Sequence, residues 1–445
     1  MLRSVAESRG TITLFGGRRI GWFDNAAAPG ASHPPTGRDR GFPYLRLFPV
    51  AVLCALWATP PTGIMEVEVF HKAVHAARGA AVGVATAVAV TCGGWSGSAI
   101  AATPDRYLVI AGAASSNIEV LRVDGVGALS NVGGSPFPAG TGALSLTATP
   151  DGRTVYVAHT VSGTISGYHL NADGTLSRIP GAQLDLGTPA VGFTISPDGS
   201  RMFATIGGAT NEVRSYRIDA SGALSPTGAQ ATPIPGISGL TMPTLSPDGR
   251  FLFLASWLNM TVSSFAVQPD GGLRAVGGPV FAGMQPTLHG VTPDGRFLYV
   301  SNEASDGVAG FAIAVDGRLT PTPGSPYRVG FLPHGVAITA DSHRLYVPAS
   351  MGGAIGGFTI GGDGALIPVP GSPYAAPAGT IPGRVVLDEA AGKVFLIDAL
   401  TAHGTTQVHS YTIAEDGSLA PSGVPVTDTG LVFSDGPDAI LTAPQ

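Results

Sequence analysis

Three side chains that could move protons or bind an anion stand beside apolar runs. Glu303 ends "RFLYVSNE", His334 lies in "LPHG", and Arg384 lies in "IPGRVV". A carboxylate or an imidazole can activate water or move a proton. A guanidinium can hold a carboxylate or a phosphate through two parallel hydrogen bonds. Together these residues indicate acid–base chemistry on an anionic, ring-shaped substrate, with Glu303, His334 and Arg384 as the catalytic candidates.

Four more residues are candidates for substrate binding, because they occupy equivalent places in a repeated pattern. They are Asn302, His289, His159 and Asp398. One column of aligned positions ends a strand, and it contains His159, Ile206, Ser256, Asn302, Ala349 and Asp398. A second column precedes a turn, and it contains Met242, His289, His334, Arg384 and Asp438. Structural alternatives remain open: a hydrogen-bonded rim residue for Glu303, backbone caps for His289 and His334, and a strand end for Asp398.

Other catalytic signatures are missing from the repeated part of the sequence. It has no Gly-x-Ser-x-Gly nucleophile motif, no Walker loop and no dinucleotide fingerprint. Cys54 and Cys92 both precede it, and its histidines lack zinc-site spacing. We therefore expect no cofactor and no metal.

The elements that must position these residues come from a repeat. One unit is a Pro-Asp-Gly turn followed by a β-branched and aromatic strand, as in "SPDGRFLFLAS" and "TPDGRFLYVSN". The other unit is a strand, an Asp-Gly hairpin and a leucine, as in "GFAIAVDGRL" and "SYTIAEDGSL". Seven copies, spaced about 46 to 53 residues apart, predict a seven-bladed β-propeller of four-stranded blades. The first copy lacks an innermost strand, and "GPDAILTAP" (436 to 444) supplies one, so we expect the C-terminal strand to close blade 1.

The sequence before the repeats is predicted to be an extension outside the propeller. Residues 1–64 have no steady period, and we expect them to be disordered or to be a misassigned upstream segment. Residues 65–101 combine Lys72 and Arg78, a small apolar stretch and "AIA" at 99 to 101, the pattern of a signal peptide. An uncleaved membrane anchor is the alternative. The propeller is then 102–445, secreted or associated with the cell envelope, with no membrane span in the mature chain.

Composition restricts the partners. The chain has 445 residues, of which 44% are hydrophobic and 12% charged, and its net charge is −6. Without a Lys/Arg cluster it offers a phosphate backbone few contacts, so nucleic acid is excluded as a partner. We expect a monomer that binds a small-molecule lactone or organic acid, or else an extracellular protein or glycan.

The repeats, with "GSPY" at 324 to 327 and 371 to 374 and "GSPF" at 134 to 137, resemble lactonase-type seven-bladed propellers. That family includes propeller 6-phosphogluconolactonases and carboxymuconate lactonizing enzymes, and the resemblance covers residues 103 to 445. The repeats are also similar to Tyr-Val-x-Asn propellers of exported proteins. "LYVSNE" matches the family's Asn-Glu, which implies that Glu303 lies in the active-site mouth. The family typically carries Gly-Pro-Arg-His before the same turn, whereas this chain has "QPTL" (285 to 288), which leaves His334 and Arg384 in the next blades as substitutes.

Two functions follow as hypotheses. The resemblance implies an exported lactonase-like protein that hydrolyses or forms a lactone of an anionic sugar or organic acid. As an enzyme it would be a carboxylic ester hydrolase similar to 6-phosphogluconolactonase. The alternative is a non-catalytic propeller scaffold that binds a glycan, a peptide or a protein outside the cytoplasm.

Overall fold

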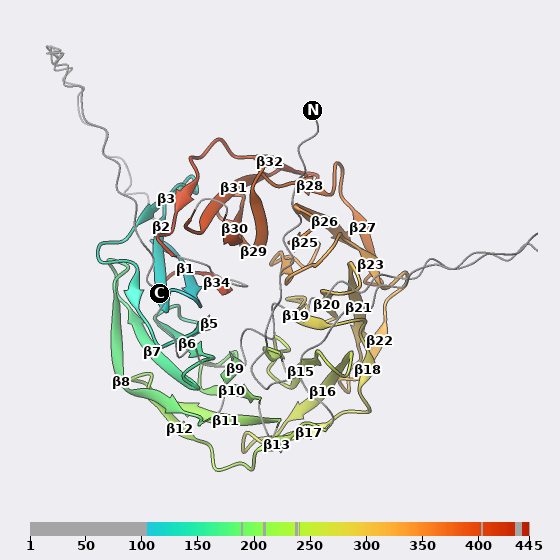
Figure 1. Ribbon diagram of the computed structural model, residues 1–445. Coiled ribbons are helices and arrows are strands. Elements are labelled where there is room, and N and C mark those ends of the chain that lie inside the picture. The colour runs from blue at the N-terminus through green and yellow to red at the C-terminus, as the bar shows by residue number, and fades with distance from the viewer. Residues whose placement is uncertain are drawn as a thin grey trace, which may run out of the picture. The chain divides into compact units, whose positions relative to one another are not determined.

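The repeated turns and strands build the predicted propeller. The computed structural model describes residues 105–187, 190–207, 211–235, 239, 241–401, 404–431 and 438–444, and all its regular elements there are β-strands. They form seven sheets arranged as blades around a common axis, so the all-β, seven-bladed fold is confirmed (Figure 1). The predicted extension, residues 1–64 and 65–101, lies outside the described residues.

Each blade is an antiparallel meander of four strands that succeed one another from the axis outward, and most blades add a two-residue strand that pairs with the third strand. Blade 1 contains β34 (Asp438–Thr442), β1 (Arg106–Gly112), β2 (Asn117–Val123), β3 (Leu129–Asn131) and the added β4 (Phe137–Pro138). Blade 2 contains β5 (Ala143–Ala148), β6 (Thr154–His159), β7 (Thr164–Leu170) and the long β8 (Leu176–Asp185). Blade 3 contains β9 (Ala190–Ile195), β10 (Arg201–Ile206), β11 (Glu212–Ile218), β12 (Leu224–Pro226) and the added β13 (Thr232–Pro233).

The remaining blades follow the same order. Blade 4 contains β14 (Thr244–Leu245), β15 (Phe251–Ser256), β16 (Thr261–Val267), β17 (Leu273–Ala275) and β18 (Val280–Phe281). Blade 5 contains β19 (Pro286–Val291), β20 (Phe297–Asn302), β21 (Gly307–Ile313), β22 (Leu319–Pro321) and β23 (Tyr327–Arg328). Blade 6 contains β24 (Ala337–Ile338), β25 (Arg344–Ala349), β26 (Ala354–Ile360), β27 (Leu366–Pro368) and β28 (Tyr374–Ala375). Blade 7 contains β29 (Thr380–Asp388), β30 (Lys393–Thr401), β31 (Gln407–Ile413), β32 (Leu419–Pro421) and β33 (Thr427–Asp428).

The C-terminal strand closes the ring as the sequence predicts. β34 pairs antiparallel with β1, with Val109 opposite Ile440. The innermost strands β29, β34 and β5 also contact one another in turn around the axis. Blade 1 therefore has no open inner edge, and both ends of the described chain are held in one sheet.

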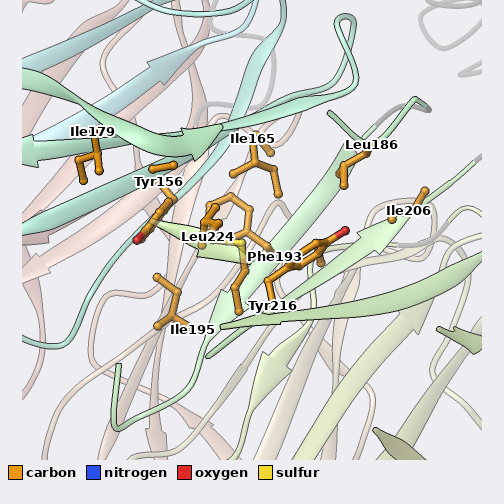
Figure 2. Close-up of a cluster of buried hydrophobic side chains, with 13 residues drawn as sticks. Tyr156, Ile165, Ile179, Leu186, Phe193, Ile195, Ile206, Tyr216 and Leu224 are labelled. Atoms are coloured by element: carbon orange, nitrogen blue, oxygen red, sulfur yellow. The ribbon is translucent and has the colours of Figure 1, made fainter. Parts of the chain in front are cut away.

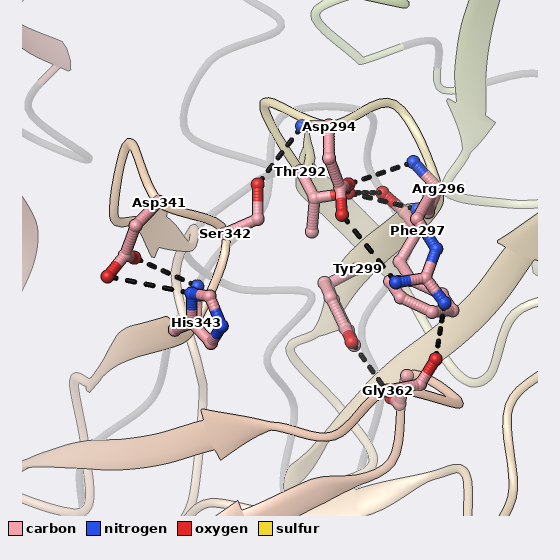
Figure 3. A network of polar contacts seen from close by, with 10 residues as sticks. Thr292, Asp294, Arg296, Phe297, Tyr299, Asp341, Ser342, His343 and Gly362 are labelled. Carbon is pink, nitrogen blue, oxygen red and sulfur yellow. Dashed lines mark hydrogen bonds and ion pairs between the residues drawn. The ribbon is translucent and has the colours of Figure 1, made fainter.

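The Pro-Asp-Gly turn is fixed by its own side chains. In blade 5, the Thr292 hydroxyl donates to Asp294 Oδ1 at 2.5 Å, and the same oxygen accepts the Arg296 N–H at 3.0 Å (Figure 3). The Asp294 N–H donates to the Ser342 hydroxyl of blade 6 at 3.0 Å. The turn thus sets the start of β20 and links two blades at the same time.

Tyrosines of the second strands join each blade to the next. Tyr299 donates its hydroxyl proton to the Gly364 carbonyl, in the Asp-Gly hairpin of the following blade, at 2.8 Å. The same bond recurs in three further blades, Tyr107 to Ala172, Tyr156 to Gly222 and Tyr346 to Gly417. These bonds satisfy phenols that are otherwise buried, which is the condition for a polar group in a core.

The hydrophobic core lies between the blades. Between blades 2 and 3, Tyr156, Ile165, Phe193 and Leu224 pack in one cluster (Figure 2). All six residues of β6 are buried, because both faces of a blade meet a neighbour. Full burial of an aromatic or aliphatic side chain stabilises a fold by about 1.5–3 kcal/mol, so the interfaces between blades hold the ring together.

The described residues contain no helix long and apolar enough to span a membrane.

Candidate active site

The candidate catalytic residues lie where the second strand of one blade ends beside the entry to an innermost strand. The Glu303 N–H donates to the Gln285 carbonyl at 3.1 Å, just after β20 ends. The His334 N–H donates to the Pro348 carbonyl at 2.9 Å, just before β24 begins. Both segments belong to the face opposite the Pro-Asp-Gly turns, and they belong to the adjacent blades 5 and 6.

Glu303 and His334 are in direct contact. Oε1 of Glu303 lies 2.9 Å from Nδ1 of His334, and their side chains are 17% and 20% exposed. An imidazole that donates Nδ1–H to a carboxylate keeps its lone pair on Nε2. Nε2 has no hydrogen-bond partner within the described part of the chain. The pair therefore presents a proton acceptor that is oriented by a carboxylate.

Arg384 lies one blade further on and reaches Gly335, the residue that follows His334. A Cβ atom built on Gly335 would be 2.8 Å from the Arg384 guanidinium, and Gly335 has a φ of +89°. Glycine takes that φ without strain and also leaves room for the guanidinium. The guanidinium therefore lies against the residue that follows His334.

Asp438 of the closing strand holds Arg384 in place. Arg384 Nη2 lies 3.1 Å from Asp438 Oδ1, and Asp438 Oδ2 accepts the Leu146 N–H at 2.8 Å. Burial raises the pKa of Asp438, while the charge of Arg384, backbone N–H groups and the charge of His334 oppose that rise. Polar groups of blades 5, 6, 7, 1 and 2 thus follow one another around the axis.

Serine hydroxyls fix the same inner strands. The Ser301 hydroxyl donates to the Leu288 carbonyl at 2.8 Å and accepts the Gly335 N–H at 3.1 Å. The Ser350 hydroxyl donates to the Pro382 carbonyl at 2.6 Å. The Ser301–Gly335 bond crosses from blade 5 to 6 and the Ser350–Pro382 bond from blade 6 to 7, so these two bonds set the spacing of the blades that carry Glu303, His334 and Arg384.

Two of the predicted substrate-binding residues are buried in the second strands. Asn302 is fully buried under Gly283, and its Nδ2 donates to the Val300 carbonyl at 3.4 Å. Asp398 is fully buried on β30, where His409 Nε2 lies 3.6 Å from its Oδ1. Both side chains are packed inside their own blades.

The two predicted substrate-binding histidines also have protein partners. His159 is fully buried, Nδ1 lies 3.2 Å from the Thr164 hydroxyl, and burial together with the charge of Arg178 lowers its pKa to about 4. His289 Nε2 lies 3.1 Å from the Phe253 carbonyl of blade 4, and burial lowers its pKa. His289 thus links the innermost strand of blade 5 to the second strand of blade 4. Among the described residues, neither histidine is in contact with Glu303 or His334.

The described residues show no metal-binding cluster at the pair. In the described ranges, no three His, Cys, Asp or Glu side chains gather in a way that could hold a metal ion. Two hollows lie at the Pro-Asp-Gly face, one beside Pro150 and Thr442 and the other beside Asp248 and Asp294. Glu303 and His334 line neither of these two hollows.

Comparisons with known proteins support the architecture. No protein-family model and no curated protein matches the chain. A solved structure of a periplasmic gluconolactonase from Pseudomonas aeruginosa matches with a TM-score of 0.61 and 20% identity, over 76% of this chain and 100% of that chain. A Bacteroides uniformis protein described as a "putative 6-phosphogluconolactonase" matches with a TM-score of 0.63 and 17% identity, over 76% of this chain and 100% of that chain. A Bacteroides fragilis protein with the same description matches with a TM-score of 0.62 and 16% identity, over 76% of this chain and 98% of that chain. The chain shares the seven-bladed propeller fold of these lactonase-type proteins.

Proposed function

We propose that the protein is a lactone hydrolase whose reaction takes place at Glu303 and His334. The observation that carries this proposal is the 2.9 Å contact between the carboxylate and the imidazole, on a partly exposed rim with a guanidinium beside it. The shared fold of solved gluconolactonase structures supports the same reaction class.

The chemistry follows from the roles that the contacts favour. His334 Nε2 takes a proton from a water molecule as the water oxygen attacks the lactone carbonyl carbon. Glu303 holds the ring of His334 and stabilises the imidazolium that forms. Arg384 donates hydrogen bonds toward the negative charge that develops on the carbonyl oxygen. The ring C–O bond then breaks, the leaving ring oxygen takes the proton from His334, and a hydroxy acid is released.

The test is hydrolysis of a lactone panel by the full chain and its variants, followed by pH titration. We expect His334→Gln and Glu303→Gln to lose about 10²- to 10⁴-fold in turnover, the usual contribution of a positioned acid–base group. His343→Gln is the matched control, because His343 Nδ1 lies 3.6 Å from Asp341 Oδ2 on the opposite face of blade 6. It should keep full turnover. Equal turnover in all four proteins would contradict the proposal, and no turnover on any ring size would favour the scaffold alternative.

We also propose that the protein is exported. The proposal rests on the signal-like stretch at 65–101, and one of the proteins with the same fold is described as periplasmic. Mass spectrometry of the protein from fractionated cells should find an N-terminus near Ala102 in the exported fraction. An intact N-terminus in the cytoplasmic fraction would overturn this proposal.

A further inference from the structure

The geometry points to an uncharged lactone with an apolar arm as the substrate class of this site. This inference rests on the proposed function. The lactone ring lies at Glu303 and His334, and the arm lies along an apolar rim formed by Met284, Phe331 and Met351.

The rim residues flank the pair through backbone contacts. The Met284 carbonyl accepts the N–H of Ala304, the residue after Glu303, at 3.3 Å. The Phe331 carbonyl accepts the N–H of Gly352, the residue after Met351, at 3.1 Å. Met284 therefore lies beside Glu303, while Phe331 and Met351 lie side by side on the blade that carries His334.

These side chains are exposed although they are large and apolar. Met284 is 44% exposed, Phe331 46% and Met351 62%. Leu258 and Met260 of blade 4 extend the rim, at 48% and 41%, and Met260 is tied to the segment before Met284 by the bond from the Ala282 N–H to its carbonyl. Exposed apolar side chains of soluble proteins occur at ligand-binding grooves and at interaction sites, and in this proposal they receive the alkyl arm.

The charges at the site disfavour an anionic substrate. The Arg384 guanidinium lies against Gly335, next to His334 in the chain, and the Asp438 carboxylate already lies 3.1 Å from it. Glu303 adds a negative charge. A sugar phosphate would meet the Glu303 carboxylate and a guanidinium whose charge Asp438 already balances. That guanidinium still has N–H groups for a single developing oxyanion, but a dianionic phosphate calls for guanidinium charge that is not already balanced. An uncharged ring with an alkyl arm avoids this repulsion and removes apolar surface from water.

The first measurement is kcat/KM of the full chain for γ-lactones with alkyl arms of increasing length, beside gluconolactone. We expect kcat/KM to rise about two- to fourfold for each added methylene until the arm reaches beyond the rim. Phe331→Ser and Met284→Gln should lose most of this rise through KM and leave the shortest lactone unchanged. Val315→Gln is the matched control, since Val315 is 89% exposed in the hairpin at the other face of blade 5.

A second measurement separates this inference from the lactonase proposal. Alkyl lactams, which keep the ring carbonyl but resist hydrolysis, are titrated into the full chain by calorimetry. Binding that strengthens with arm length and is lost in Phe331→Ser supports the apolar arm even if no lactone is turned over. Turnover or binding that does not change with arm length, or that favours gluconolactone, overturns the inference of an apolar arm but does not contradict the lactonase proposal. Absence of both turnover and binding refutes both.

Discussion

Asp438→Ala is expected to destabilise the propeller by about 3–5 kcal/mol, the usual cost of removing one partner of a buried ion pair. The Arg384 and Asp438 side chains are only 18% and 5% exposed, so the guanidinium would be left without its counter-charge in a place that water reaches poorly. The Leu146 N–H would also lose its acceptor. Both losses fall where the C-terminal strand closes the ring. A lower denaturant midpoint with an unchanged slope is the expected measurement.

Asp438→Asn is the matched control, because the amide keeps the size and shape of the side chain but carries no charge. The amide oxygen can still accept the Leu146 N–H, and we expect a loss of only about 1–2 kcal/mol. Equal losses in the two variants would show that charge balance dominates. No loss in Asp438→Ala would contradict the role of this pair in ring closure.

The sequence was sufficient for the architecture because its signals are local. Pro150-Asp151-Gly152 and Asp316-Gly317 each define a turn through φ angles and side-chain bonds within a few residues. Such turns recur with each blade, so their spacing determines the number of blades. Closure by the C-terminal strand followed from counting innermost strands.

The site was only partly predictable. Alignment of the repeats placed Glu303, His334 and Arg384 near one end of the blades, but it could not show that His334 faces Glu303 across a blade boundary. That contact depends on how two loops sit against each other, and on Gly335 making room for Arg384. Asp438 stood in the same aligned column, and an acidic residue in an innermost strand was the available signal for a partner of Arg384.

Burial explains why the other candidates were harder to judge. In a propeller both faces of a strand are covered, so alternation of polar and apolar residues does not separate the solvent side from the core. His159 and Asp398 therefore resembled mouth residues in the alignment, although both side chains are fully buried. The two-residue strands such as β23 and β28 were also missed, because so short a segment has no period.

Glu119 was not singled out from the sequence either, because both faces of its strand are covered. A substitution of Glu119 is expected to have the second large effect on stability. Glu119→Gln is expected to leave stability nearly unchanged at pH 5 and to raise it by about 3 kcal/mol at pH 8.5. Glu119 lies on β2 and is fully buried, and neither carboxylate oxygen has a hydrogen-bond partner by distance and angle. Burial raises its pKa from 4.5 to about 7, Ser135 opposes that rise, and the charge of Asp428 in blade 7 adds to it.

The sign follows from the direction of that change. A carboxyl group whose pKa is higher in the folded state than in the unfolded state binds more protons when folded. Its contribution to stability is complete below about pH 4.5 and is lost as the pH rises through about 7. The glutamine side chain keeps the shape and cannot ionise, so it removes this loss at alkaline pH.

The readout is the difference in unfolding free energy between Glu119→Gln and the unchanged chain, measured by urea denaturation from pH 5 to 8.5. Glu415→Gln, at an exposed hairpin position, is the control and should show no such trend. A difference that stays constant with pH would mean that Glu119 is ionised or solvated in the folded state. A difference that grows with pH would locate an alkaline weak point at the seam of blades 1 and 7, since Glu119 and Asp428 belong to these two blades.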